Sequence, residues 1–188
     1  MSVVKHKIID EIGLIEISNP PVNAISAAVR IGLLETIEKL SSNEKVKSIV
    51  ITAPERTFLA GADIKEFGKK VDAPILGKIC DKIESLNKIV VASLHGTPLG
   101  GGLEVAMSAH YRIAAPNTKV GLPEVLLGIL PGAGGTQRLP RLCGVDMAID
   151  MMLTGRHVPA KEALSSGIID EITENNNTLD NGIEYAKK

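Results

Sequence analysis

The chain has 188 residues, of which 44% are hydrophobic and 23% are charged, a balance typical of one globular domain with a buried core. The formal net charge of −1 gives no basic field, and an aromatic content of 2% gives no stacking platforms for nucleic acid. No apolar run reaches the roughly 18 residues of a membrane span, and the N-terminus lacks signal-peptide or transit-peptide character. We therefore expect no nucleic-acid partner and no membrane association.

The two cysteines, Cys80 and Cys143, are too few for a disulfide scaffold. No Cys/His cluster has the spacing of metal ligands, and the histidines and Cys143 have no matched partner for a nucleophilic triad. We expect reduced thiols in a cytosolic or organellar-matrix setting, with no metal site.

The N-terminal segment predicts two short strands within residues 5–18, joined by a turn at 11–13 and ended by Asn19-Pro20-Pro21. A helix is predicted from Ser26, which can cap it, to about Leu40, because apolar residues recur there at three- and four-residue spacing. Such an amphipathic helix needs a sheet to pack against.

The next segments supply that sheet. Continuous, largely β-branched runs at 47–52 and 89–94 predict strands that are buried on both faces. A loop at 53–63 and a helix at 74–87 are expected between them, and another helix should begin at about Leu103. Beyond Gly132 the sequence predicts mainly helix, with a short strand at 168–172. The alternation of strands and helices indicates an α/β fold.

Three consecutive glycines, Gly100 to Gly102, stand between a predicted strand and a predicted helix. Glycines cost backbone entropy, so they indicate unusual backbone angles or a close approach. The first N–H groups of a helix lack intrahelical partners and favour an anion or a developing oxyanion, and Gly101 N–H is our candidate donor. The alternative is that the glycines only permit tight strand-to-helix packing. A dinucleotide site is not indicated, because G-x-G-x-x-G spacing is missing.

Glu124 follows Pro123 at a predicted helix start, where a carboxylate can simply complement the helix dipole. Apolar residues at 125–127 and 129–130 surround it in the sequence. They favour a second interpretation, in which an apolar pocket raises the pKa of Glu124 and makes it an acid near neutral pH.

Two further loops contain small residues. In the segment 59–64 the backbone could lie against a flat ligand, with Asp63 as a helix N-cap. The segment 131–139 superficially resembles a phosphate loop, but it lacks the Gly-Lys-Ser/Thr ending and a β-branched strand before it. A nucleotide triphosphatase is therefore not expected.

Four separated blocks resemble the enoyl-CoA hydratase/isomerase, or crotonase, superfamily, in the right order and over nearly the whole chain. They are FLAGADIKEF (58–67), HGTPLGGGLEVAMSAHYRIAA (95–115), VGLPEVLLGILPGAGGTQRLPRLCG (120–144) and MLTGRHVPAKEALSSGIID (152–170). Together with NPPVNAIS (19–26), the third block is similar to the hydratase part of peroxisomal bifunctional enzymes.

The resemblance implies a crotonase-like spiral of ββα units, truncated in its C-terminal helical region. Residues 1–188 would form a single domain, with a core at about 5–173 and the start of a C-terminal helical segment at 174–188. The thioester carbonyl would be held by the N–H groups of Ala62 and Gly101, with Glu104 as the base that activates water and Glu124 as the acid. The implied substrate and CoA contacts are Ala60, Ala62, Asp63, Ile64, Lys65, Gly100 and Gly101, although Lys65 could equally be a solvated surface charge.

The implied activity is hydration of trans-2-enoyl-CoA in fatty acid β-oxidation, with isomerisation of 3-enoyl-CoA to 2-enoyl-CoA as a second reaction. The alternatives are a non-catalytic acyl-CoA-binding module and another reaction of the family, such as acyl-CoA hydrolysis. No cofactor is implied, since coenzyme A is part of the substrate, and no NAD site is expected. The family implies a peroxisomal location, with cytoplasm or mitochondrial matrix as alternatives.

Free-standing hydratases usually continue beyond the region that corresponds to Lys188. The resemblance therefore implies a fragment, a short form or one domain of a longer enzyme. The partners that it implies, beside the acyl-CoA thioester, are further copies in a homo-oligomer or a dehydrogenase domain fused in a longer form.

Overall fold

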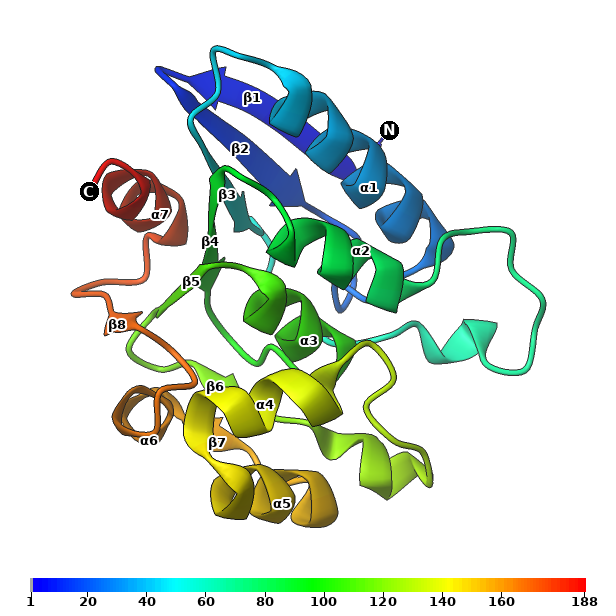
Figure 1. Ribbon diagram of the computed structural model, residues 1–188. Coiled ribbons are helices and arrows are strands. Elements are labelled where there is room, and N and C mark those ends of the chain that lie inside the picture. Colours follow the sequence, from blue (N-terminus) through cyan, green and yellow to red (C-terminus); the bar gives the residue numbers. More distant parts are fainter. Residues whose placement is uncertain (1) are drawn as a thin grey trace.

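The computed structural model describes residues 2–188 and shows an α/β fold around a six-stranded sheet (Figure 1). The strand order is β1-β2-β3-β4-β5-β8; the β1–β2 pair is antiparallel and the remaining neighbours are parallel. The strands are β1 (Val4–Ile9), β2 (Ile12–Ile17), β3 (Ser48–Thr52), β4 (Ile89–Leu94), β5 (Tyr111–Ala114) and β8 (Glu171–Ile172). A second, two-stranded sheet pairs β6 (Lys119–Val120) with β7 (Val158–Pro159).

The central strands are buried on both faces, as their continuous apolar runs predict. In β3, Ile49 and Ile51 face the larger core cluster, whereas Val50 between them faces a smaller cluster. The neighbouring strand β4 divides its side chains in the same way, with Val90 on the first side and Val91 on the second. The sheet therefore needs covering layers on both sides.

Helices on one side of the sheet pack in succession along the chain (Figure 1). They are α1 (Ala27–Ser42), α2 (Leu76–Glu84), α3 (Gly101–Ser108), α4 (Gly135–Cys143) and α5 (Val145–Thr154), and the short α6 (Ala160–Ser165) packs against β7 and β8. Helix α7 (Thr178–Ala186) lies on the other face, against β3 and β4. No helix within residues 2–188 is long and apolar enough to cross a membrane.

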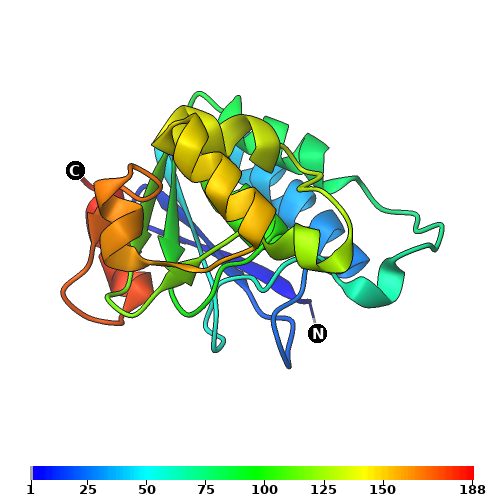
Figure 2. The same cartoon turned by 90° about the horizontal axis from the view of Figure 1, so that it is seen from below.

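A projecting segment connects β3 to α2. It carries the 3-10 helix η1 (Ile64–Glu66), and both views show it extending away from the rest of the fold (Figures 1 and 2). Glu66 attaches the segment to α1, because its carboxylate accepts hydrogen bonds from Ala27 N (2.7 Å) and from Arg30 Nη1 (2.8 Å). A second 3-10 helix, η2 (Pro123–Leu127), follows β6.

Several predicted boundaries were wrong. The first two strands meet at Asp10 and Glu11, where Asp10 takes a positive φ of 55°, so the turn precedes the expected 11–13. The helix after the glycine run begins at Gly101 instead of about Leu103, and α2 is shorter than the expected 74–87. In the expected strand at 168–172 only the last two residues pair, because Ile168 N and Ile169 N donate instead to Ala163 O in α6, at 2.8 and 3.2 Å.

Candidate active site

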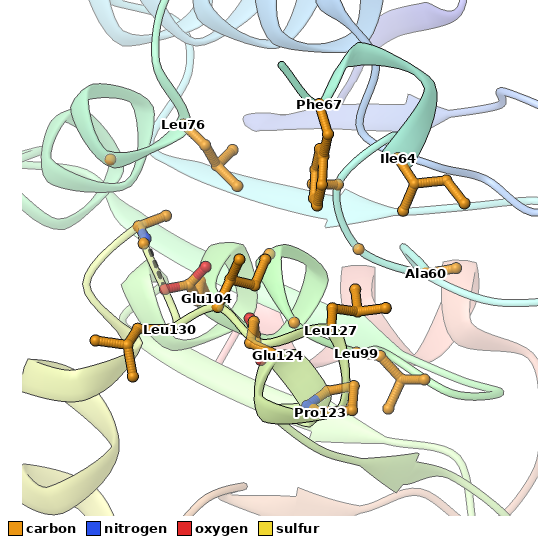
Figure 3. Close-up of a pocket in the computed structure, with 18 of the residues that line it drawn as sticks. Ala60, Ile64, Phe67, Leu76, Leu99, Glu104, Pro123, Glu124, Leu127 and Leu130 are labelled. Carbon is orange, nitrogen blue, oxygen red and sulfur yellow. Dashed lines mark hydrogen bonds between the residues drawn. The ribbon is translucent and has the colours of Figure 1, made fainter. Parts of the chain in front are cut away.

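A pocket of about 350 Å³ lies where the projecting segment, α2, the start of α3 and the η2 region meet (Figure 3). Its walls are mainly apolar, and Figure 3 shows Leu76, Phe67 and Ile64 across the pocket from Glu104 and Glu124. These two glutamates are the only ionisable side chains among the residues that line it. An apolar cavity with few polar groups is the usual form of a small-molecule site.

Each of the three glycines before Glu104 has a different role. Gly100 caps α3 with φ 51° and ψ −125°, a conformation that favours glycine. A Cβ on Gly102 would lie 2.1 Å from the Leu59 carbonyl oxygen, so this glycine permits tight helix packing. Gly101 borders the pocket, where its N–H is the first of the helix and has no intrahelical acceptor. The packing interpretation is thus confirmed at Gly102, whereas the role of Gly101 N–H as an oxyanion donor stays a prediction.

Ala62 lines the same pocket. Ile25 forms a parallel bridge with it, in which Ile25 N donates to Gly61 O (2.8 Å) and Asp63 N donates to Ile25 O (3.4 Å). In such a bridge the residue between the two bonded neighbours directs its own N–H to the opposite side. Ala62 N lies 3.7 Å from the place where a Cβ of Gly101 would stand. The structure therefore places Ala62 and Gly101, the two residues named by the family resemblance, close together at one pocket.

Glu104 lies in the first turn of α3 and is 2% exposed. Its Oε1 accepts hydrogen bonds from Ala133 N (2.7 Å, dashed in Figure 3) and from Gly135 N (2.8 Å). Burial raises the pKa of Glu104, while the two amides and the nearby charge of Arg138 act in the opposite direction. The amides stabilise the ionised form, as a general base requires.

Glu124 lies in η2 and is also buried, but its carboxylate differs from that of Glu104 in its hydrogen bonds. Its Oε2 makes no hydrogen bond to any other part of residues 2–188. Burial raises its pKa to about 7, the backbone N–H of Glu124 itself acts in the opposite direction, and the charge of Glu104 adds a smaller increase. A raised pKa was expected from apolar neighbours in the sequence. Leu127, Ile129 and Leu130 do line the pocket, whereas Val125 and Leu126 do not.

The other predicted contact residues divide into two groups. Ala60, Ile64 and Gly100 line the pocket, whereas Asp63 and Lys65 do not. The Asp63 carboxylate caps η1 by accepting a hydrogen bond from Lys65 N at 3.0 Å, so its predicted capping role is confirmed. Both residues lie beside the lining residue Ile64 in the chain, and their contact with substrate or CoA stays a prediction.

Asn23 is a supporting residue that the sequence analysis did not identify. It is 1% exposed and its φ is 56°, a conformation that asparagine tolerates better than most residues. Its side-chain amide donates to the carbonyls of Ile17 and Thr57, both at 3.2 Å, and to that of Phe58. Asn23 therefore holds the loop that leads to Ala62. The NPPVNAIS block contained the residue without indicating this role.

The segment 131–139, which the sequence analysis left without a function, lies directly against Glu104. It supplies the two amides that bind Glu104 Oε1, and it contains the buried Arg138. Nothing in the spacing of its glycines indicated that their partner would be a carboxylate on another helix.

Comparisons with known proteins agree with this geometry. Residues 7–188 match the family described as enoyl-CoA hydratase/isomerase. The peroxisomal bifunctional enzyme of Danio rerio is 49% identical over 177 residues, which are 94% of this chain and 24% of the relative. The probable enoyl-CoA hydratase of Bacillus subtilis is 40% identical over 176 residues, which are 90% of this chain and 68% of that protein.

A solved structure, the enoyl-CoA hydratase from Mycobacterium tuberculosis, superposes with a TM-score of 0.93 at 29% identity and covers 100% of this chain and 75% of that one. The chain spans about a quarter of the length of its bifunctional relatives. The family match over nearly all residues and the shared fold show that the chain belongs to the enoyl-CoA hydratase/isomerase family.

Proposed function

We propose that this chain adds water to trans-2-enoyl-CoA thioesters in fatty acid β-oxidation. One observation carries the proposal: a single pocket contains an amide-bound carboxylate, Glu104, a second carboxyl of raised pKa, Glu124, and two converging backbone amides. Hydration of a conjugated thioester needs a base for water, an acid for C2 and donors for the charge that develops on the carbonyl oxygen. The name of the bacterial relative, probable enoyl-CoA hydratase, agrees with this reaction.

In the proposed reaction, Ala62 N–H and Gly101 N–H donate to the thioester oxygen. Ionised Glu104 accepts a proton from water as the water oxygen bonds to C3, and the electrons of the double bond form an enolate on the thioester. Protonated Glu124 then gives its proton to C2, so that one water is added in total. Exchange with solvent returns both carboxyls to their starting states. Each amide donor is worth about a hundredfold to a thousandfold in rate.

The pKa of Glu124 supports a second reaction, the isomerisation of 3-enoyl-CoA to 2-enoyl-CoA. A carboxyl with a pKa of about 7 is present in both protonation states near neutral pH. It can therefore remove a proton from C4 and return it to C2. This activity should be absent from a Glu124→Gln variant, and a 3-enoyl-CoA left unchanged by active hydratase would contradict it.

We further propose that residues 1–188 form one domain, that coenzyme A is part of the substrate, and that the reaction needs no separate cofactor. The bifunctional relatives support a longer form in which a dehydrogenase domain is fused to this one, and a peroxisomal location. The bacterial relative leaves the cytoplasm as the alternative location.

The test follows the loss of enoyl-thioester absorbance with crotonyl-CoA and decenoyl-CoA. Glu104→Gln and Glu124→Gln should each lower kcat by about a hundredfold to ten-thousandfold, because each removes a proton-transfer group while preserving shape. Glu38→Gln, on the exposed side of α1, is the matched control and should leave kcat unchanged.

Other outcomes would identify the alternatives. Binding of CoA esters without turnover by the native chain would favour a non-catalytic binding module. Release of free CoA thiol would favour acyl-CoA hydrolysis. Turnover that both glutamine variants retain would refute the two-glutamate mechanism.

A further inference from the structure

The segment between η2 and α4 forms a receptor for one carboxylate oxygen. Ala133 N and Gly135 N both donate to Glu104 Oε1, at 2.7 and 2.8 Å. Gly134 between them has φ 101°, which directs the two flanking N–H groups toward the same point. Since both bonds go to Oε1, Oε2 is left for a water molecule. The orientation of Glu104 therefore depends on the conformation of this segment.

Arg138 stabilises the conformation of this segment through its backbone. Its side chain is 9% exposed, and its Nη1 donates to Ala133 O at 2.9 Å. Ala133 is thus held at both ends, by Glu104 at its N–H and by Arg138 at its carbonyl. A Cβ on Gly134 would stand only 2.1 Å from Arg138 Nη1, so the guanidinium occupies the space that a side chain at position 134 would take.

The same guanidinium is attached to a second helix. Its Nη2 donates to Asp81 Oδ1 (2.9 Å) and Glu84 Oε2 (2.7 Å), both on α2. The two carboxylates are largely exposed, which makes them weak stabilisers by themselves. The two carboxylates do fix the orientation of the Arg138 guanidinium, because a planar group with several hydrogen-bond partners has one orientation that satisfies all of them.

We propose that Arg138 is a positioning residue, which holds the 131–135 segment so that its two amides orient the Glu104 carboxylate toward water. Its effect on turnover rests on the proposed hydration. Its effect on the carboxylate can be measured without substrate.

The charged and titratable groups around Glu104 come from three elements. Arg138 on α4 acts to lower the pKa of Glu104, and Glu124 on η2 is a like charge when it is ionised. Cys80 on α2 has its pKa raised to about 12, mainly by burial, so it is a neutral thiol. Removal of Arg138 should therefore raise the pKa of Glu104, through the lost charge and through loosened amide bonds.

Two substitutions distinguish the effect of the positive charge of Arg138 from the effect of its planar hydrogen-bonding geometry. Arg138→Met removes both, whereas Arg138→Lys keeps a charge but cannot bind Ala133 O, Asp81 and Glu84 in one plane. Arg141→Met, at an exposed arginine on the same helix, is the matched control. The readouts are the ¹⁵N–¹H resonances of Ala133 and Gly135, the ¹³C titration of the Glu104 carboxyl, and kcat and KM for crotonyl-CoA.

Arg138→Met should shift both amide resonances, raise the titration midpoint of Glu104 and lower kcat by about tenfold to a hundredfold, with KM changed by less than about threefold. Arg138→Lys should shift the amides with a smaller change in the titration, and Arg141→Met should match the native protein. A folded Arg138→Met protein with native amide shifts and a native Glu104 titration would overturn the proposal.

If Arg138→Met does not fold, the double variant Asp81→Asn/Glu84→Gln provides a second test, because it weakens the ion pairs that orient the Arg138 guanidinium. It should shift the same two amides by a smaller amount, and unchanged amides would again overturn the proposal. If the native protein does not hydrate crotonyl-CoA, the proposed function fails, yet the two resonance readouts still decide the role of Arg138.

Discussion

At the residue scale, two glutamates of one pocket differ because their surroundings differ. Glu104 is buried with two amide donors on one oxygen, whereas Glu124 is buried with an oxygen that has no partner within residues 2–188. Donors to a carboxylate favour its charged form, and burial without donors favours the neutral form. Burial raises the pKa of both carboxyls, and the two amides oppose this shift at Glu104, which agrees with the proposed roles of Glu104 as base and Glu124 as acid.

This difference predicts how activity depends on pH. The proposed mechanism requires protonated Glu124 as the acid, so kcat/KM for hydration should fall as pH rises through about 7. The fall on the acidic side should follow the protonation of Glu104. A pH–rate profile of the native chain with crotonyl-CoA checks both limbs, and a profile that stays flat from neutral to alkaline pH would contradict the assignment of Glu124.

The same shift predicts an effect on stability. The pKa of Glu124 rises from 4.5 to about 7 on folding, so the folded state binds more protons between these values and loses stability as pH rises through that window. Glu124→Gln abolishes this loss. Relative to the native chain, its free energy of unfolding should increase by roughly 2–3 kcal/mol between about pH 4.5 and pH 8. Urea unfolding at both pH values measures it, with Glu38→Gln as the control.

At the element scale, the start of α3 shows how adjacent glycines serve packing and the pocket separately. The backbone of Leu59 lies against Gly102, whereas the neighbour of Gly101 is the flexible end of Leu76, 2.8 Å from where a Cβ would stand. A flexible side chain can move aside, but a carbonyl held in a packed segment cannot.

Alanine at these two positions should therefore have opposite effects. Gly102→Ala should lower the free energy of unfolding by about 3 kcal/mol or more, since its methyl would overlap the Leu59 carbonyl. Gly101→Ala should cost less than about 1 kcal/mol but weaken turnover, since its methyl would enter the pocket beside Ala62 N. Thermal unfolding and crotonyl-CoA hydration measure the two effects, and equal stability losses would contradict this distinction.

The sequence was informative for elements that carry their own pattern. Helix α1 begins after Ser26, whose Oγ accepts a hydrogen bond from Val29 N, and its buried stripe has the predicted three- and four-residue spacing. Strand β4 has the predicted bounds. The short strands β5 to β8 were missed or misplaced, because a ladder of two to four residues forms only where a partner strand is already in place.

At the scale of the whole molecule, one face of the sheet lies beside the pocket and the other face packs against α7. The pocket lies on the side of α2 and α3, and α7 covers a separate apolar cluster on the other side. The cluster consists of Ile12, Leu14, Val50, Val91 and Ile113. Buried hydrogen bonds join α7 to the sheet, from Ser93 Oγ to Thr178 O (2.6 Å) and from Thr52 Oγ1 to Thr178 Oγ1 (3.2 Å).

Gly182 allows α7 to approach the sheet, because a Cβ there would lie 2.8 Å from Val50 Cγ1 and 3.1 Å from Ser93 Cβ. Gly182→Val should lower the free energy of unfolding by about 2–3 kcal/mol. The affinity for a CoA ester should stay unchanged, because the pocket lies on the far side of the sheet. Glu184→Val, exposed on the same helix, is the control for helix propensity. Denaturant unfolding and ligand titration measure these effects, and loss of affinity in the folded variant would contradict the separation of the two faces.

The sequence by itself determined the α/β alternation, the apolar strands of the core and, through family resemblance, the two glutamates and two amides of the pocket. These features are local patterns or motifs, so their information lies in neighbouring residues. Only the tertiary structure decided that Asn23 and Arg138 donate hydrogen bonds to backbone carbonyls of segments beside the pocket, and that one face of the sheet is covered by α7. Each of these depends on which distant segment supplies the partner, and contacts across the fold leave no periodic signal along the chain.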